Sequence, residues 1–437
     1  MISKQKLALE ILQTLRQSGY EAYFVGGSVR DLLLKKTPKD FDIATNALPE
    51  EVAKLFNKTV AVGAQFGVML VVKEGLPFEV ATFREDKGYQ DGRRPNEVAF
   101  TNAKEDAVRR DFTVNGLFYD PVSRKVLDWV GGQKDLKKKW IRAIGDPDRR
   151  FSEDHLRLLR AVRFASNLHF KIEPKTLAAI KRHAKKIGGV SHERTRDELV
   201  KMMTGPDPAG ALTLLDQTGL LKEVLPEVSR MKGVQQPRAY HPEGDVFKHT
   251  KLLLKQLKNA DVVLAFGCLL HDVGKPPTYK RADRIRFNGH DRVGARMTET
   301  ILTRLRFPND LKSKIVACVD GHMRFKDVRQ MRESTLKKFM QRETFDTELK
   351  QHRIDCLASH GDISNWRFLT QKVKTLGKEQ IRPKPLLNGK DLLDLGYPEG
   401  PLIGKILRNV ENAQLERKIS TKQQALEWVQ KRQKPAG

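Results

Sequence analysis

The sequence has few cysteines and no long apolar run. Its 437 residues include only Cys268, Cys318 and Cys356, which are far apart and do not form a CxxC pair. Neither a disulfide framework nor a zinc ribbon is supported, and we expect these cysteines to be core residues in a reducing compartment. No stretch of about 18 apolar residues, signal-peptide core or lipidation motif occurs. We therefore predict a soluble, cytoplasmic protein without a membrane partner.

Acidic residues are also scarce relative to basic ones. Aspartate and glutamate total 54 against 81 lysines and arginines, which gives a formal net charge of +27. The excess is spread along the chain rather than gathered in a tail. A field of this sign favours a polyanionic partner such as nucleic acid.

The secondary-structure signals change along the chain. Residues 4–18 predict a helix, and alternating strands and turns follow to about residue 130, most clearly at 68–72 and 78–83. From about residue 135 onward the pattern is helical. This order predicts an α+β fold, with a mixed head followed by an all-helical remainder. Glycine- and proline-containing stretches at 231–244 and 382–385 are predicted linkers.

A glycine turn after a strand-like run is the first candidate site. Residues 26–31 (GGSVRD) follow this run, and Asp40 and Asp42 come next in DFDIAT. The glycines let backbone amides approach a phosphate, with Arg30 one turn into the following helix. Two carboxylates at i and i+2 of a strand project from one face and suit Mg²⁺. The segment therefore predicts a nucleotide and metal site.

GGSVRD followed by DFDIAT resembles the first motif of the class II tRNA nucleotidyltransferases and bacterial poly(A) polymerases. These enzymes belong to the polymerase-beta-like nucleotidyltransferase superfamily. The resemblance implies that Asp40 and Asp42 bind catalytic Mg²⁺ and that Gly27 and Arg30 hold an incoming triphosphate. The implied reaction is attack by an RNA 3′-hydroxyl on the α-phosphate of a nucleotide.

Two further features of the head follow this motif. Glu79, on a neighbouring strand, is the best candidate for a third carboxylate, and a buried-edge glutamate paired with Arg84 is the alternative. Residues 84–95 form a polar stretch with two glycines and no apolar periodicity, which predicts a mobile loop.

Residues 109–116 (RRDFTVNG) resemble the family's second motif. In that family its polar residues hold the ribose and triphosphate of the nucleotide, which implies this role for Arg110 and Asp111. An aspartate beside an arginine can favour ribose over deoxyribose, because a 2′-hydroxyl both donates and accepts hydrogen bonds. From the residues alone, a surface ion pair is the alternative.

A helical stretch downstream contains the third motif of the head. Ser152 is predicted as a helix N-cap, and Asp154 and Arg157, at i and i+3, share a helix face. Spacing alone also fits a routine salt bridge. The segment resembles the family's EDxxR motif, in which the aspartate and arginine act as an amino-acid template for the incoming base. Arg160 and Arg163 follow it and are further nucleotide-binding candidates.

The template has a physical logic. Cytosine and adenine each present an amino donor next to a ring-nitrogen acceptor, which a carboxylate and a guanidinium can meet. Uracil and guanine present the reverse order, so a buried polar group would be left unpaired at a cost of about 1–3 kcal/mol. Further on, SHERTRDEL resembles the family's ERxxxEL motif, and we interpret its Arg194 and Glu198 as structural support.

A separate set of histidines and aspartates lies in the C-terminal half. Their order, H…HD…D, resembles the HD phosphohydrolase superfamily. The resemblance implies four ligands for one divalent ion and two candidates for a second. Imidazole with carboxylate suits Mn, Fe, Ni or Zn better than Mg. The four implied ligands are His249, His271, Asp272 and Asp355, and the two further candidates are His290 and His322.

The resemblances together imply four domains. We expect a nucleotidyltransferase head at 1–135, a helical neck and RNA-binding region at 136–232, an HD domain at 240–362 and a helical tail at 363–437. No motif marks the tail, which has only helical pattern and positive charge.

The implied function is template-independent addition of CCA to the 3′ end of tRNA. The expected partners are the tRNA 3′ end, CTP and ATP, with no obligate protein partner and with phosphohydrolase activity in the HD domain. An A-adding tRNA nucleotidyltransferase or a poly(A) polymerase is the alternative. Residues 60–68 lack the basic pair typical of poly(A) polymerases, and residues 84–95 retain the loop that CC-only enzymes lack. An RNA-binding HD phosphohydrolase with a vestigial polymerase site is the alternative of another class, which the intact head motifs disfavour.

Overall fold

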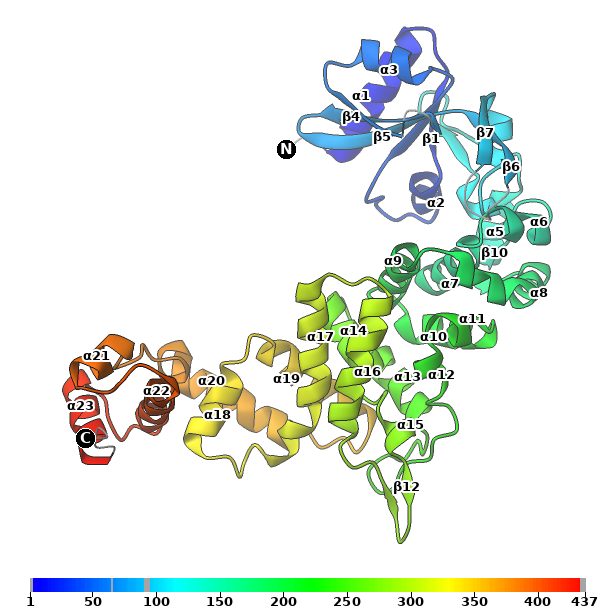
Figure 1. Ribbon diagram of the computed structural model, residues 1–437. Coiled ribbons are helices and arrows are strands. Elements are labelled where there is room, and N and C mark those ends of the chain that lie inside the picture. The colour runs from blue at the N-terminus through cyan, green and yellow to red at the C-terminus, as the bar shows by residue number, and fades with distance from the viewer. Residues whose placement is uncertain (1–2, 64–65, 90–94, 433–437) are drawn as a thin grey trace. The chain divides into compact units, whose positions relative to one another are not determined.

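The computed structural model describes residues 3–63, 66–89 and 95–432 (Figure 1). The chain divides into two compact units. The first consists of Met1–Ser229 with Arg304–Arg306, and the second of Arg230–Thr303 with Phe307–Gly437. The finer domain boundaries expected from sequence remain predictions.

The first unit is built on a seven-stranded sheet in the order β3-β4-β5-β2-β1-β8-β9. Its paired strands are antiparallel except for β2 and β5, which are parallel. The strands are β1 (Ala22–Val25), β2 (Asp42–Thr45), β3 (Thr59–Gly63), β4 (Val68–Lys73), β5 (Leu76–Thr82), β8 (Phe118–Asp120) and β9 (Lys125–Leu127). The predicted strands at 68–72 and 78–83 are therefore confirmed as β4 and β5.

Three helices flank this sheet. α1 (Lys4–Gln17) begins where the Ser3 side chain accepts a hydrogen bond from the backbone of the first turn, and its apolar residues recur at helical spacing and are buried. α1 and α3 (Pro49–Leu55) lie on one side of the sheet and α2 (Gly27–Leu33) on the other (Figure 1). The predicted helix at 4–18 is confirmed as α1.

The polar stretch after β5 was predicted to be a loop, and this prediction is wrong for residues 84–89, which form a strand. β6 (Arg84–Tyr89) pairs antiparallel with β7 (Pro95–Phe100), because residues 95–100 supply a second strand for the backbone hydrogen bonds. The loop predicted at 84–95 also includes residues 90–94, which lie outside the described residues, and its mobility stays a prediction.

The rest of the first unit is mainly helical. The predicted all-helical remainder is wrong at two places, and at the first of them the two-residue strands β10 (Trp140–Ile141) and β11 (Lys171–Ile172) pair in parallel. The helices are α4 (Ala103–Val108), η2 (Thr113–Asn115), α5 (Gly132–Lys138), α6 (Pro147–Glu153), α7 (Arg157–Leu168), α8 (Pro174–His183), η3 (Ala184–Gly189), α9 (His192–Met203), α10 (Pro208–Gln217), α11 (Leu220–Val224) and α12 (Pro226–Ser229).

The second unit is helical apart from one small hairpin. This hairpin pairs β12 (Lys280–Arg281) with β13 (Ile285–Arg286). The helices are α13 (Val246–Gln256), α14 (Val262–Leu270), α15 (Lys275–Thr278), α16 (His290–Arg304), α17 (Asn309–Gly321), η4 (His322–Asp327), α18 (Glu333–Met340), α19 (Phe345–Ala358), α20 (Ser364–Ile381), α21 (Gly389–Asp394), α22 (Pro401–Leu415) and α23 (Lys422–Arg432). The predicted α+β class is therefore confirmed.

The C-terminal helices α21, α22 and α23 have a hydrophobic core of their own. Leu392, Ile406, Val410, Ala425 and Val429 are almost completely buried in it. Within the described residues, we find no helix whose length and apolar character together would suit a bilayer crossing.

Candidate functional site

The glycine turn after β1 lies beside Asp42. β1 and β2 pair with Val25 opposite Asp42, so the turn that follows Val25 is next to the Asp42 carboxylate. Gly26 has a φ of 69°, and a Cβ built on it would lie 3.1 Å from the Arg110 guanidinium and 3.9 Å from Asp42 Oδ2. Glycine suits both this conformation and this close approach. Gly27, the first residue of α2, follows directly.

The Asp42 carboxyl group lies in a negative environment. Burial, followed by the charge of Glu79, raises its pKa to about 6, and Arg110 opposes the rise. Glu79 is on β5, which runs parallel to β2 with Ile43 paired to Val80, and it is exposed. Its position fits the third carboxylate proposed from sequence, and its exposure argues against a buried-edge glutamate. A carboxyl group whose pKa is raised by neighbouring carboxylates favours a cation beside it.

Asp40 lies two residues before β2 begins. The prediction that Asp40 and Asp42 lie on one regular strand is therefore wrong. Its side chain is 76% exposed, and one carboxylate oxygen is 2.5 Å from Lys4 Nζ. After burial and Glu79, the Asp40 charge also contributes to the raised pKa of Asp42. The two predicted metal ligands are therefore electrostatic neighbours.

A chain of hydrogen bonds joins Arg30 to Arg160. Arg30 Nη1 donates to Asn115 Oδ1 at 2.7 Å, and Asn115 Nδ2 donates to Asp111 Oδ1 at 3.1 Å. Arg160 Nε donates to Asp111 Oδ2 at 2.8 Å. Three residues predicted to bind the nucleotide, Arg30, Asp111 and Arg160, are thus brought together through Asn115.

The buried carboxylate of Asp106 holds the arginines of the second motif. Arg109 Nη2 lies 2.7 Å from Asp106 Oδ1, and Arg110 Nη2 lies 2.9 Å from Oδ2. Burial would raise the pKa of Asp106, but the charges of Arg110 and Arg109 outweigh it and lower the pKa. Asp106 therefore stays charged and fixes Arg110 beside Gly26.

Asp154 and Arg157 do not share a helix, contrary to the prediction. α6 ends at Glu153, Asp154 has φ −141° and ψ 106°, and α7 begins at Arg157. Ser152 is thus in the last turn of α6 and is not an N-cap. The reason is that Asp146, followed by a proline, caps an earlier helix start with its side chain.

Each member of the proposed base template is held by another residue. Arg194 Nη2 lies 3.1 Å from Asp154 Oδ2, and Arg157 Nη1 lies 2.8 Å from Glu153 Oε2. Arg157 is buried, with 9% of its side chain exposed. Asp154 and Arg157 therefore do not form the salt bridge with each other that their spacing allowed. Arg194, interpreted from the sequence as structural support, contacts Asp154.

Phe164 gathers three predicted nucleotide-binding arginines. The guanidinium groups of Arg30, Arg160 and Arg163 lie 5.4, 5.2 and 4.0 Å from the centre of its ring. Arg163 also donates through Nε to Glu198 Oε2 at 2.5 Å. Three guanidinium groups around one aromatic ring concentrate positive charge, which suits phosphate oxygens.

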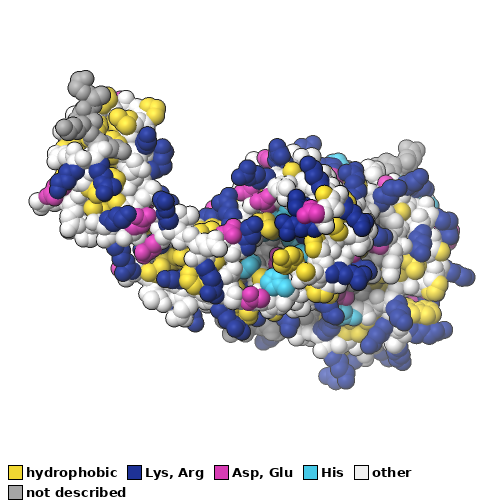
Figure 2. Space-filling model, turned by 90° about the horizontal axis from the view of Figure 1, so that it is seen from below, with side chains coloured by type: hydrophobic (Ala, Val, Ile, Leu, Met, Phe, Trp, Pro, Cys, Tyr) yellow, Lys and Arg dark blue, Asp and Glu magenta, His cyan; other side chains and the backbone are white. Residues whose placement is uncertain are grey.

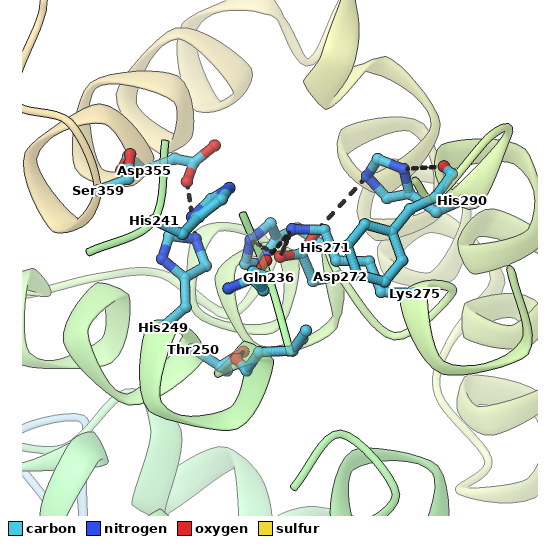
Figure 3. Close-up of polar contacts among 12 residues, drawn as sticks. Gln236, His241, His249, Thr250, His271, Asp272, Lys275, His290, Asp355 and Ser359 are labelled. Atoms are coloured by element: carbon cyan, nitrogen blue, oxygen red, sulfur yellow. Dashed lines mark hydrogen bonds and ion pairs between the residues drawn. The ribbon is translucent and has the colours of Figure 1, made fainter. Parts of the chain in front are cut away.

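The second unit brings together the four implied metal ligands (Figure 3). His249 is on α13, His271 and Asp272 follow α14, and Asp355 is on α19. His249 Nε2 lies 2.9 Å from Asp355 Oδ1, and His271 Nε2 lies 3.2 Å from Asp272 Oδ2. One ligand atom from each of His249, His271 and Asp272 lies within 4.8 Å of the others.

The two further histidines share Asp272 with this group. His290 Nε2 lies 3.5 Å and His322 Nε2 lies 3.9 Å from Asp272 Oδ1. The Nε2 atoms of His290 and His322 are 3.1 Å apart. Asp272 therefore lies between two adjoining sets of possible ligands.

Backbone carbonyls orient three of these histidines. Nδ1 of His271, His290 and His322 lies 2.9, 2.8 and 2.6 Å, respectively, from the carbonyl oxygen of the residue three positions earlier. In a neutral imidazole, an Nδ1–H that donates leaves Nε2 as an acceptor. The Nε2 atoms of His290 and His322 then face each other as two acceptors, which a cation between them would stabilise. Metal-binding histidines are usually oriented by such a hydrogen bond.

Several buried polar atoms of the cluster lack a hydrogen bond of normal geometry. Within the described part of the chain these include His249 Nδ1, His271 Nε2 and Asp272 Oδ2. Their charged neighbours are close: Glu243 lies 2.8 Å from His249 Nδ1, His271 Nε2 lies 3.2 Å from Asp272 Oδ2, and Lys275 Nζ lies 2.6 Å from Asp272 Oδ2. An unsatisfied buried polar group is costly, and a bound cation would satisfy these atoms. The donor set therefore fits a divalent metal ion.

The protonation states differ across the cluster. Burial, and then the neighbouring imidazoles, lowers the pKa of His322 to about 4, and burial also lowers that of His290. Burial disfavours charged His249 too, but Asp355 and Glu243 outweigh it and raise the His249 pKa to about 9. Neutral imidazole is the form that binds a metal. His290 and His322 are therefore ready to ligate at neutral pH, and His249 must release a proton.

A cavity of about 770 Å³ opens over the cluster. On the face shown in Figure 2, histidine side chains reach the surface beside hydrophobic ones, with Lys and Arg side chains around them. Lys275, whose Nζ lies 2.6 Å from Asp272 Oδ2, is one of the lining cations. The lining includes Asp272, Lys275, Arg284, Arg286, His290, His322 and Asp355.

Three protein-family descriptions match successive parts of the chain. "Poly A polymerase head domain" matches residues 22–142, "Probable RNA and SrmB- binding site of polymerase A" matches 169–232, and "tRNA nucleotidyltransferase domain 2" matches 293–429. The CCA-adding enzyme of Lactobacillus gasseri is 34% identical over 428 residues, which cover 96% of this chain and 95% of that enzyme. This chain belongs to the CCA-adding enzyme family.

Other CCA-adding enzymes match parts or all of the chain. The enzyme of Levilactobacillus brevis is 49% identical over 216 residues, 49% of this chain and 54% of that relative, so this match spans about half of each. The crystal structure of the Bacillus stearothermophilus CCA-adding enzyme in complex with CTP has a TM-score of 0.77 and 28% identity, covering 99% of this chain and 98% of that one. The nucleotidyltransferase head expected from GGSVRD and DFDIAT is therefore confirmed, and enzymes of this family use divalent metal ions.

Sequence reasoning missed several residues that contact the two candidate sites of this CCA-adding family member. Lys275 had a usable signal, because it lies at i+3 from Asp272 in HDVGK. Glu243 lies 2.8 Å from His249 Nδ1, and no periodicity pointed to it. Gln236 Oε1 accepts a hydrogen bond from Lys275 Nζ at 2.5 Å, and His241 Nδ1 lies 3.1 Å from Glu243 Oε1. The missed residues are Asp106, Asn115, Phe164, Gln236, His241, Glu243 and Lys275.

Asp111 should make the first unit sensitive to acid. Burial would raise its pKa, but Arg160 and Asn115 outweigh it and lower the pKa from 3.8 to about 2. A lowered folded-state pKa stabilises the fold above pH 4, and this contribution is lost as the pH falls through 2. We expect Asp111→Asn to destabilise the protein by about 2 kcal/mol at pH 7 and by less at pH 3. Denaturant unfolding at both pH values measures this, and an equal loss at both would contradict it.

Proposed function

We propose that this protein adds CCA to the 3′ end of tRNA, using CTP and ATP. The observation that carries the proposal is the pairing of Val25 with Asp42, which places the glycine turn, the Asp42 carboxylate and Arg110 side by side. Family membership and the likeness to a CCA-adding enzyme in complex with CTP support it.

Asp40 and Asp42 would hold Mg²⁺ at this site. Their oxygen donors and the raised pKa of Asp42 fit a hard cation. When bound, Mg²⁺ supplies charge stabilisation to the hydroxyl that attacks the α-phosphate and to the departing pyrophosphate. Arg110, fixed by Asp106, would meet the triphosphate next to these carboxylates.

The remaining nucleotide contacts are assigned to the network around Phe164. Gly27 and Arg30 would hold the triphosphate, and Asp111, positioned by Arg160, would face the ribose. The other arginine at Phe164, Arg163, adds positive charge. A bound phosphate would relieve the repulsion among the guanidinium groups.

Asp154 and Arg157 would select the base. We expect Asp154→Ala to raise incorporation of U relative to C by about tenfold or more. The carboxylate that accepts a hydrogen bond from the exocyclic amino group of cytosine is then absent. The cost of about 1–3 kcal/mol for leaving that carboxylate unpaired against uracil is absent as well. Values of kcat/KM for CTP and UTP on a tRNA lacking CCA measure the ratio. Asp148→Ala is the matched control, since Asp148 lies on α6 and pairs with Arg182. An unchanged ratio in Asp154→Ala would remove this residue from the template.

One assay separates CCA addition from A addition. A tRNA lacking CCA, and one ending in CC, are each incubated with a single labelled nucleotide. A CCA-adding enzyme uses CTP on the first and ATP on the second. Use of ATP alone would favour the A-adding or poly(A) alternative.

The affinity for tRNA should depend steeply on salt. The protein has a formal net charge of +27, so we expect most of its contacts with tRNA to be with phosphates. Each such contact releases counterions that are condensed on the tRNA. The dissociation constant should therefore rise by about 10³-fold or more between about 50 and 200 mM salt if 6 or more phosphates are contacted. Filter binding across this range measures the slope. A dissociation constant independent of salt would contradict a phosphate-dominated interface.

A second activity is favoured by the histidine cluster of the second unit. We propose that His249, His271, Asp272 and Asp355 bind a transition metal such as Mn, Ni, Fe or Zn and that the cavity hydrolyses phosphate esters. The unsatisfied polar atoms and the facing Nε2 atoms of His290 and His322 support it. A metal-dependent phosphohydrolase with a vestigial polymerase site is the alternative for the whole chain, and lack of any nucleotide addition would favour it.

A further inference from the structure

The β12–β13 hairpin carries an excess of positive charge beside the histidine cavity. Residues 280–286 contain four basic residues and one acidic residue, Asp283. Lys280 and Arg286 are directly paired across the hairpin. Like charges placed opposite each other destabilise a hairpin, so this arrangement does not stabilise the protein when no ligand is bound. A bound polyanion would offset the repulsion.

Most of this charge is not neutralised within the protein. Arg286 forms an ion pair with Asp283 at 2.8 Å. Lys280, Arg281 and Arg284 form no salt bridge with any residue between 3 and 432 that the structure describes, and all three are exposed. They are therefore available to a ligand.

The basic residues divide into an inner and an outer pair. Arg284 and Arg286 line the cavity together with the histidine cluster. Lys280 and Arg281 are not among its lining residues, yet they are on the strand paired with β13. A mononucleotide confined to the cavity reaches the inner pair only. A ligand that uses all four must carry further phosphates beyond the cavity.

Aromatic side chains accompany this charge. Tyr240 is 65% exposed and lines the cavity. Phe287 lines it as well, with its ring centre 5.9 Å from that of Tyr279. Exposed aromatic rings beside cations are the usual means of binding single-stranded nucleic acid, because every base can stack on them. This argues for a nucleic acid over inorganic polyphosphate, which has no bases.

We infer that the cavity and the hairpin together bind the end of a single-stranded nucleic acid, and the tRNA substrate proposed above makes this nucleic acid an RNA. Its terminal phosphate lies at the histidine cluster, the preceding phosphates run along the hairpin, and a base stacks on Tyr240. The inference rests on the phosphohydrolase activity proposed above and names its substrate class. In the reaction, water adds to the terminal phosphorus, the P–O bond to the ribose breaks, and the ribose oxygen leaves with a proton from that water.

The test compares a short ribo-oligonucleotide bearing a 3′-phosphate with adenosine 3′-monophosphate, using the full chain and Mn²⁺. The double variant Lys280→Ala and Arg281→Ala should lower kcat/KM for the oligonucleotide by about tenfold, through KM, and change that for the mononucleotide by less than about twofold. Lys255→Ala with Lys258→Ala removes the same charge from exposed residues outside the cavity lining and is the matched control. It should leave both substrates unchanged.

A second variant tests the stacking contact. Tyr240→Ala should lower kcat/KM for the oligonucleotide by about tenfold, and Tyr240→Phe should retain it, because the ring and not the hydroxyl stacks. A deoxyribo-oligonucleotide with a 3′-phosphate and inorganic polyphosphate complete the substrate set. Equal or better use of either of these would overturn the assignment to RNA.

The remaining outcomes separate this inference from the proposed phosphohydrolase. Equal loss for oligonucleotide and mononucleotide, or equal loss in the lysine control, would overturn the hairpin's role while leaving hydrolysis intact. If the wild type hydrolyses no phosphate ester, the proposed activity fails. An oligonucleotide carrying 4-thiouridine near its 3′ end then decides the binding surface by photocrosslinking. Crosslinks to Tyr240 or residues 280–286 would support the surface, and their absence would overturn it.

Discussion

Replacing Asp42 with alanine is expected to abolish nucleotide addition while tRNA binding is kept. The variant removes the half-buried carboxylate that adjoins the glycine turn and Arg110, so the reacting phosphate would lose the cation that we propose Asp42 helps to hold. We expect less than about a hundredth of the wild-type kcat, because a catalytic metal stabilises the transition state of the reaction and does not hold the tRNA. Single-turnover addition of labelled CTP to a tRNA lacking CCA measures the rate, and filter binding measures the tRNA affinity.

Three further variants sharpen this test. Asp42→Asn keeps the shape and removes the charge, so it should fail as alanine does, and Asp40→Ala should also fail. Glu50→Ala, an exposed carboxylate of α3 in the same unit, is the matched control and should keep full activity. Addition by Asp40→Ala or Asp42→Ala above about a hundredth of the wild-type rate would contradict a two-metal role for the pair.

The head could be predicted from the sequence because its signals are local. The helix α1 follows from apolar residues at helical spacing, and β4 and β5 follow from short runs of strand-forming residues. The glycine turn and Asp42 are separated by few residues, and one hairpin-like pairing places them together. The order of the H…HD…D residues likewise anticipated a cluster that the fold assembles.

The interactions that orient these residues could not be predicted, because they join distant parts of the chain. Asp355 meets His249 across 106 residues, and Arg160 meets Asp111 across 49. The error at Asp154 has a different origin. The polar segment contains two residues that could cap a helix start, Asp146 and Ser152, and the helix begins after Asp146. Sequence spacing showed which residues could share a face but not which helix would form.

The second large effect is expected from replacing His271 and Asp272 together with alanine. The variant removes an imidazole and a carboxylate that adjoin both sets of possible ligands. Any phosphatase or cyclic phosphodiesterase activity with Mn²⁺ or Ni²⁺ should fall by about a hundredfold or more, since neither ligand has a replacement at the centre of the cluster. Nucleotide addition should survive, because these residues lie in the second compact unit and the nucleotidyltransferase motifs lie in the first.

Hydrolysis and nucleotide addition are both measured on the same variant, together with a control. Asp310→Ala removes an exposed carboxylate of α17 in the second unit, 2.9 Å from Lys314 Nζ, and should affect neither activity. If addition collapsed in the His271 and Asp272 variant despite a native circular dichroism spectrum, the two sites would not be independent. If hydrolysis were undetectable in the wild type with every divalent metal tried, the cluster would be a structural element. If hydrolysis alone is lost, one chain carries two separate phosphate chemistries, and a tRNA end trimmed by one could be rebuilt by the other.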